Sequence, residues 1–167
     1  MNSEIKIEDL VERQELVLSR LLEWIKAADS RLRLVLPIST TMLGALAVLI
    51  PPFSGWTVLG GIAASGATFF LALSITFAAF ASFPRTKGPL GSLIYFGGIV
   101  SKDLGQYEAA VKSQTLDEYL EDLVRQSHRN AQIADRKFVW LQRSIGCMFV
   151  AAVPWALAIL ILYSGTL

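Results

Sequence analysis

Four side chains in a short glycine-rich stretch could bind an anionic, planar ligand. Arg85 and Lys87 supply two positive charges, and Tyr95 and Phe96 supply two aromatic rings a few residues later. Cations can hold a phosphate, and an aromatic ring can stack on a base. The two cations have a second explanation, because basic residues at a membrane surface also anchor at lipid phosphates. The residues alone leave both explanations open.

Enzymatic chemistry and metal binding have little support in this sequence. The chain has one His and one Cys, His128 and Cys147, which are too few for a zinc site built from those residues. The acidic residues at 117–122 are typical of a helix start, where carboxylates interact favourably with the helix dipole. We therefore expect no catalytic residue, no metal and no cofactor.

The distribution of charge predicts the elements that position these residues. All 15 Lys and Arg residues fall within residues 1–33 and 85–143. Residues 34–84 and 144–167 carry no charge and are largely apolar. Because a helix needs about 20 apolar residues to cross the hydrocarbon core of a membrane, the first stretch predicts two spans and the second predicts one.

The same pattern divides the chain into four regions. They are a cytosolic amphipathic helix (1–33), a transmembrane hairpin (34–83, with spans at about 34–50 and 57–82), a cytosolic helical region (84–143), and a third span with a short outer tail (144–167). Cytoplasmic flanks of spans collect Lys and Arg. This places the N-terminus in the cytoplasm and the C-terminus in the periplasm of a bacterial inner membrane. Because the first 33 residues are charged throughout, we expect no cleavable signal peptide.

Two long helices are expected on the cytosolic side. Apolar residues recur at helical spacing before the first span and again after residue 115. Thr115 and Glu118 have the spacing of a capping box, which opens the second helix. Each apolar stripe can pack on the other. The predicted fold is an all-α integral membrane protein in which three transmembrane helices are continued by a cytosolic helical stalk.

Small and hydroxyl-bearing residues inside the first two spans allow two readings. The hydroxyl residues are Ser39, Thr40, Thr41, Ser65, Thr68, Ser74 and Thr76. They either bond to the preceding turn or to a neighbouring helix, or some of them line an aqueous path when subunits assemble. The small residues at 60–67 permit close helix packing within one subunit or between subunits.

Charge argues against several function classes. No Asp, Glu, Lys, Arg or His lies within a span, which argues against proton relays, coupled transport and voltage sensing. The net charge of +1 gives no basic surface for nucleic acid.

Several segments, taken in order, resemble the transmembrane effectors of the Pycsar family. Ala27 to Arg31 resembles an Ala-Asp-x-Lys/Arg element before the first span. The later segments are Phe83-Pro84-Arg85, Leu93 to Ile99, Tyr107, Glu118 to Leu123, Gln126 and Ile133 to Phe138. The resemblance covers residues 20–160, although Arg31 stands where Lys is commoner.

The resemblance implies an effector in antiphage defence. In such systems a pyrimidine nucleotide cyclase makes cyclic CMP or cyclic UMP on infection. The effector responds by damaging the inner membrane, which kills or arrests the cell in an abortive infection. With it we expect homo-oligomers, and we add Asp29 and Arg31 at the mouth of the first span as candidate ligand contacts. The alternative is a three-span adaptor or scaffold without catalysis, whose stalk docks a protein partner.

Overall fold

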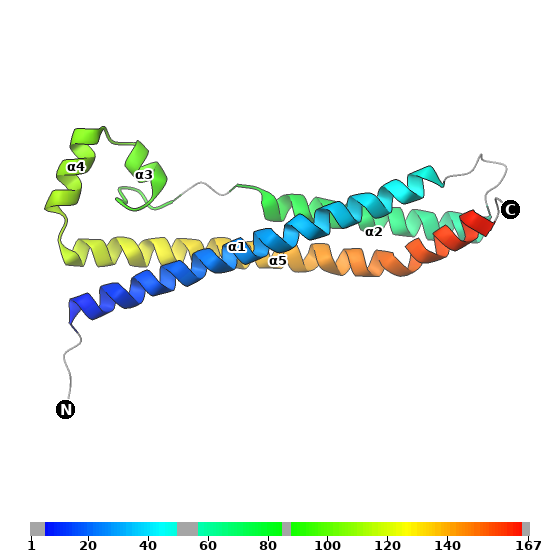
Figure 1. Ribbon diagram of the computed structural model, residues 1–167, viewed down its shortest axis with the longest axis horizontal. Coiled ribbons are helices and arrows are strands. Elements are labelled where there is room, and N and C mark those ends of the chain that lie inside the picture. Colours follow the sequence, from blue (N-terminus) through cyan, green and yellow to red (C-terminus); the bar gives the residue numbers. More distant parts are fainter. Residues whose placement is uncertain (1–5, 50–56, 85–87, 165–167) are drawn as a thin grey trace, which may run out of the picture. The chain divides into compact units, whose positions relative to one another are not determined.

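The computed structural model is built from helices and describes residues 6–49, 57–84 and 88–164. The helices are α1 (Ile7–Val48), α2 (Val58–Ser82), α3 (Phe96–Val100), α4 (Leu104–Ser113) and α5 (Leu116–Ser164) (Figure 1). No strand occurs within the described ranges. The predicted all-α fold is confirmed.

Three of these helices, α1, α2 and α5, are long and apolar enough to cross a membrane. The three predicted spans are therefore present, and the protein is a membrane protein. Helix α1 continues through Pro37, and α5 continues through Pro154. Proline is tolerated in such helices because neighbouring helices and hydroxyl side chains satisfy the backbone groups that it frees.

Side-chain caps fix where α4 and α5 begin. The Thr115 hydroxyl accepts a hydrogen bond from the Glu118 N–H at 3.3 Å, and the Glu118 carboxylate accepts one from the Thr115 N–H at 2.8 Å. This is the capping box that the sequence predicts. Asp103 and Gln106 form a second capping box at the start of α4, which the sequence analysis did not anticipate.

The chain divides into two compact units. The polar unit comprises residues 1–27 and 84–135, and the membrane unit comprises residues 28–83 and 136–167. In the polar unit α1 and α5 are in contact, because the Tyr119 hydroxyl of α5 donates a hydrogen bond to the Glu15 carboxylate of α1 at 2.7 Å. Leu21 and Leu123, one on each helix, are buried.

The membrane unit packs three helices around two apolar clusters. The first cluster contains Leu46, Ala63, Ala64, Ala67, Leu71, Ala151 and Ala158. The second contains Ala28, Leu32, Val35, Ala78, Ala81 and Leu141. Alanine predominates on α2, so the small residues of this span serve close packing within one subunit.

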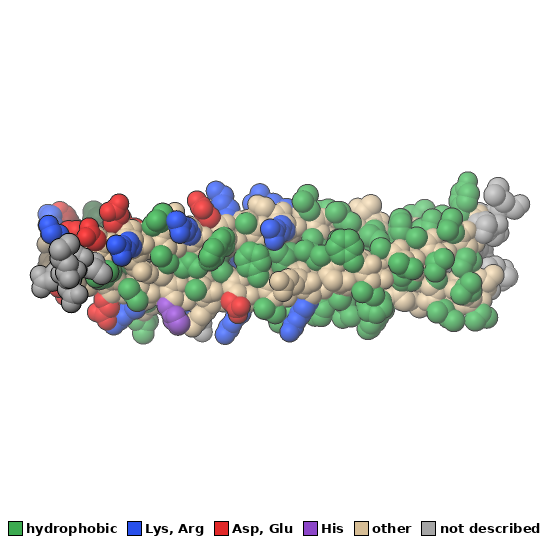
Figure 2. Space-filling view, turned by 90° about the horizontal axis from the view of Figure 1, so that it is seen from below, with side chains coloured by type: hydrophobic (Ala, Val, Ile, Leu, Met, Phe, Trp, Pro, Cys, Tyr) green, Lys and Arg blue, Asp and Glu red, His purple; other side chains and the backbone are tan. Residues whose placement is uncertain are grey.

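The surface of the spans is apolar. Residues such as Ile62, Phe69, Phe149 and Leu160 are exposed. Figure 2 shows charged side chains, interspersed with hydrophobic ones, on one part of the face and hydrophobic side chains without charged ones on another. Exposed apolar side chains on a span suit contact with lipid rather than with water.

Candidate ligand-binding site

A glycine-rich turn precedes α3 and is held on α5 by Asp122, whose residue surface is 8% exposed. The carboxylate oxygen Oδ2 accepts hydrogen bonds from the Ser92 hydroxyl at 3.0 Å and from the Leu93 N–H at 2.8 Å. The Gln126 side-chain amide donates to the Ser92 oxygen at 3.1 Å, and the Tyr95 N–H donates to the same oxygen at 2.9 Å. The two hydrogen bonds to Asp122 offset the cost of burying its carboxylate. Asp122 and Gln126 therefore set the shape of the turn from another element.

Glycines make room for this turn and for the Tyr95 ring. A Cβ atom at Gly98 would lie 2.1 Å from the Ser92 carbonyl oxygen, so α3 can approach the turn this closely only with glycine there. A Cβ atom at Gly88 or Gly97 would lie 2.5 Å from the Tyr95 ring. The ring thus occupies space that side chains at these two positions would fill.

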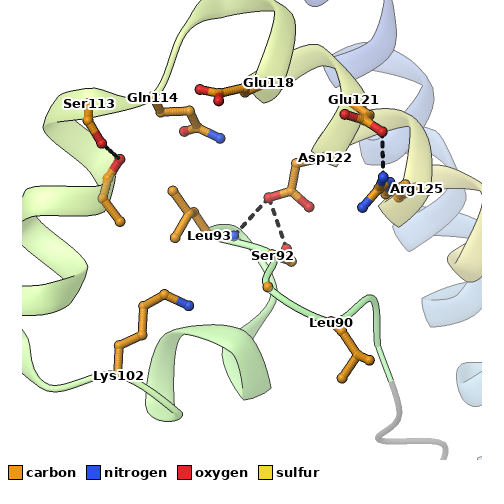
Figure 3. A pocket seen from close by; sticks show the side chains of 12 residues that line it. Leu90, Ser92, Leu93, Lys102, Ser113, Gln114, Glu118, Glu121, Asp122 and Arg125 are labelled. Carbon is orange, nitrogen blue, oxygen red and sulfur yellow. Dashed lines mark hydrogen bonds and ion pairs between the residues drawn. The ribbon is translucent and has the colours of Figure 1, made fainter.

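A cavity of about 400 Å³ lies between the turn, the end of α4 and the beginning of α5 (Figure 3). We call it the carboxylate cavity. Figure 3 shows the Lys102 ammonium pointing into the cavity and the Asp122 carboxylate directed at the turn. The Arg125 guanidinium is held in an ion pair with Glu121. The charged residues that line this cavity are Lys102, Glu118, Glu121, Asp122 and Arg125.

A second cavity, of about 340 Å³, carries the aromatic rings, and we call it the aromatic cavity. The centroids of the Tyr95 and Phe96 rings are 4.6 Å apart. Among the described residues that line this cavity, Arg129 is the one that carries a charge. Its Nη1 atom donates a hydrogen bond to the Gln132 side-chain oxygen at 3.2 Å. The lining residues are Leu18, Leu22, Gly88, Ile94, Tyr95, Phe96, Gln126, Arg129, Asn130 and Ile133.

The two cavities differ in the ligand charge that they favour. An anion in the carboxylate cavity would lie near three carboxylates, and one of the two cations there already neutralises Glu121. An anion in the aromatic cavity would meet Arg129 without a carboxylate among the described lining residues. Unlike charges attract more strongly when less water separates them. The aromatic cavity is therefore the better site for an anionic planar ligand.

The structure brings together two of the six predicted ligand residues. Tyr95 and Phe96 line the aromatic cavity. Arg85 and Lys87 lie outside the described residues, directly before Gly88, which is a lining residue.

Asp29 and Arg31 belong to the membrane unit and are not among the residues that line the two described cavities. The Asp29 carboxylate of α1 forms an ion pair with the Lys137 ammonium of α5. The Arg31 side chain is exposed. Asp29 thus has a structural partner. Asp29 and Arg31 belong to the membrane unit, whereas the two aromatic rings belong to the polar unit.

The part of the aromatic cavity that α5 supplies was not predicted from the sequence. Gln126, Arg129, Asn130 and Ile133 recur at spacings of three and four residues. Such residues share one face of a helix. That spacing is the available signal. From the sequence, Gln126 and Ile133 are named only within the segments that resemble the Pycsar effectors, and Arg129 and Asn130 are given no role.

The family model of the Pycsar effector protein domain matches residues 13–164 of this chain. The chain belongs to the Pycsar effector family. Another Pycsar effector, PtPycTM of Propioniciclava tarda, is 26% identical to it in an alignment that covers 84% of this chain and 78% of PtPycTM. No solved structure matches it. The resemblance that the sequence segments indicate is therefore confirmed.

Membership in this family identifies the biological setting. Pycsar effectors act in antiphage defence, and this chain is accordingly a defence effector located in a membrane. The family is one of effectors rather than of known catalysts.

Proposed function

We propose that this Pycsar effector senses a cyclic pyrimidine mononucleotide, cyclic CMP or cyclic UMP, and then impairs the bacterial inner membrane. A partner nucleotide cyclase would supply the messenger on infection. The effector itself turns over no substrate. The observation that carries the proposal is the aromatic cavity, where Arg129 and the Tyr95 and Phe96 rings line one space.

Each part of a cyclic pyrimidine nucleotide has a chemical counterpart in this cavity. Its phosphodiester carries one negative charge, which suits the Arg129 guanidinium. Its base is planar and can stack on the Phe96 or Tyr95 ring. The side-chain amides of Gln126 and Asn130 each contain a donor and an acceptor, as does the edge of either pyrimidine.

Helix α5 connects the aromatic cavity directly to the spans. Arg129 and Asn130 lie on the same unbroken helix as the third span, because α5 runs from Leu116 to Ser164. In this proposal the membrane unit is closed in one packing of this helix and open in another. A ligand that binds more tightly to the open packing increases the population of molecules in that packing. Moving that population from 1:99 to 99:1 needs about 5.5 kcal/mol of differential binding. We expect a homo-oligomer, in which several bound ligands share this requirement.

Binding and leakage can be measured on the same purified protein. The protein is placed in dye-loaded lipid vesicles, and cyclic CMP, cyclic UMP, cyclic AMP and linear CMP are added in turn. Cyclic CMP or cyclic UMP should bind and release dye. No binding and no leakage with any nucleotide would contradict the proposal and favour an adaptor that docks a protein partner.

Two arginines on one helix provide a matched pair of variants. Arg129→Gln should weaken nucleotide binding about tenfold or more, because it removes a charge-assisted phosphate contact of about 1.5–3 kcal/mol. Arg125→Gln, in the carboxylate cavity, should bind as the unchanged protein does. Equal losses in the two variants would place the ligand elsewhere.

Charge reversal at Arg85 should also weaken binding if that residue reaches the phosphate, provided that the variant still inserts correctly.

A further inference from the structure

One serine from each of the three spans meets the others inside the membrane unit. The Ser39 and Ser74 hydroxyls are 3.1 Å apart, and the Ser74 and Ser144 hydroxyls are 3.2 Å apart. Ser74 Oγ also lies 2.9 Å from the Ser144 carbonyl oxygen, and Ser144 Oγ lies 2.8 Å from the Ser74 carbonyl oxygen. All three residues are fully buried. We call this group the serine layer.

Other hydroxyls in the same spans bond differently. Thr40, which is exposed, donates to the Leu36 carbonyl oxygen of its own helix at 3.0 Å, and Thr76 donates to the Ala72 carbonyl oxygen at 2.8 Å. Such bonds to the preceding turn are the usual solution for a hydroxyl in a membrane helix. The serine layer bonds across helices instead, although each serine could turn back to its own helix.

This alternative makes the serine layer easy to open. An unsatisfied polar group is costly in lipid. When the helices part, each serine hydroxyl can still bond to the preceding turn of its own helix, as the hydroxyls of Thr40 and Thr76 already do. Opening therefore leaves no hydroxyl without a partner and exposes three polar groups to the new space.

The position of the serine layer suits the entry of water. On α1 it lies between Val35 and Leu46, which belong to the two apolar clusters of the membrane unit. On α5, Ser144 directly follows Arg143, so the serine layer is close to the charged end of the spans. Many neighbouring core residues are alanines, so a small displacement of the helices would open a gap.

We infer that the serine layer is a permeation site for water and small ions, closed in the arrangement described here and opened when the three helices part. Hydroxyl oxygens accept hydrogen bonds from water and coordinate small cations, and hydroxyl groups donate to anions. The site therefore admits small hydrated species of either charge. This inference rests on the proposed impairment of the membrane and names the place where it begins.

The first test needs no nucleotide. Ser74→Asn inserts a larger polar side chain into the serine layer, whereas Thr76→Asn places the same group on the exposed side of the same helix. In vesicles carrying an imposed proton gradient and a pH-sensitive dye, Ser74→Asn should dissipate the gradient at least about tenfold faster than the unchanged protein. Thr76→Asn should match the unchanged protein. Equal rates in both variants, or no increase in a correctly inserted Ser74→Asn, would overturn the inference.

The second test follows water directly and guards against a variant that fails to insert. Ser74→Cys and Thr76→Cys are made in a Cys147→Ala background and exposed to a water-soluble thiol reagent, with and without cyclic CMP or cyclic UMP. Cysteine at 74 should react several-fold faster only under conditions in which the vesicles leak. Leakage with an unreactive cysteine at 74 would refute the permeation site and leave the proposed function intact. If Ser74→Asn leaks without ligand but no nucleotide changes the leakage of the unchanged protein, the permeation site stands and the proposed function is contradicted.

Discussion

Tyr119 is the described side chain of the polar unit whose ionisation the structure shifts most clearly. Its hydrogen bond to the Glu15 carboxylate, with burial adding to the effect, raises the pKa of Tyr119 from 10.0 to about 12. Because folding raises this pKa, the protonated Tyr119 hydroxyl contributes its full stabilisation below pH 10. That contribution is lost as pH rises through about 12. The contact between α1 and α5 should therefore weaken in strong alkali.

The first prediction follows from this bond. The free energy of unfolding of the unchanged protein should fall between pH 10 and pH 12 more steeply than that of Tyr119→Phe, because the variant has no hydroxyl to ionise. Denaturant unfolding in detergent across this range checks it. In Glu15→Gln the pKa of Tyr119, followed by tyrosinate absorbance, should return toward 10. An unchanged titration would mean that Glu15 is not the cause.

Two buried serines on the polar unit give a second prediction. The Ser92 hydroxyl bonds to Asp122, Gln126 and the Tyr95 N–H, whereas the Ser127 hydroxyl is buried without a hydrogen-bond partner among the described residues. Ser92→Ala should lower the free energy of unfolding by about 1–3 kcal/mol, because it leaves buried groups unsatisfied. Ser127→Ala should leave it unchanged or raise it. Thermal unfolding of both variants in detergent decides, and an equal loss would contradict the expected difference.

At the scale of the elements, α1 and α5 are linked in the membrane unit by the ion pair of Asp29 and Lys137. The Lys137 side chain is 11% exposed and the Asp29 side chain is 40% exposed. Removing one partner of a buried pair costs more when the charge left behind cannot reach water. Removing the Asp29 charge should therefore cost more stability than removing the Lys137 charge.

The third prediction uses that inequality. Asp29→Asn leaves the buried Lys137 charge uncompensated and should destabilise the protein by about 1–3 kcal/mol. Lys137→Met leaves an Asp29 carboxylate that water can reach, so its cost should be smaller. Unfolding of both variants in detergent measures the order, and the reverse order would be inconsistent with this account. Nucleotide binding by Asp29→Asn also shows whether Asp29 acts as the predicted ligand contact or only as a structural partner.

The elements differ in how much of them a sequence can predict. The spans within α1, α2 and α5 were predictable, because an uncharged apolar stretch of about 20 residues is a local signal. The start of α5 was predictable because Thr115 and Glu118 are three residues apart. The bond between Ser92 and Asp122 joins residues 30 positions apart. No periodicity reports such a contact, so the turn and its cavities required the structure.

The candidate site shows the same division. Tyr95 and Phe96 were identified by their chemistry in a glycine-rich segment. Arg129 and Asn130 were not, because a cation and an amide on a long amphipathic helix are usually part of its solvated face. Only the packing of the turn on α5 places them beside the two rings.

At the scale of the whole molecule, the orientation in the membrane is the prediction on which cytosolic sensing depends. In a Cys147→Ala background, single cysteines at Ser54 and Thr166 should react with an impermeant thiol reagent added to intact cells. Cysteines at Lys87 and Lys112 should react only after the cells are opened, because basic residues stay on the cytoplasmic side. External labelling at Lys87 would contradict both the topology and a cytosolic messenger site.

The meeting of the three serines also bears on how the protein is made. A ribosome synthesises the chain from its N-terminus, and Ser144 follows Ser74 by 70 residues. During that interval the first two spans can join through Ser39 and Ser74, but the reciprocal bonds between Ser74 and Ser144 cannot form. The layer of three serines is therefore completed only when the last helix of the membrane unit is inserted beside the other two.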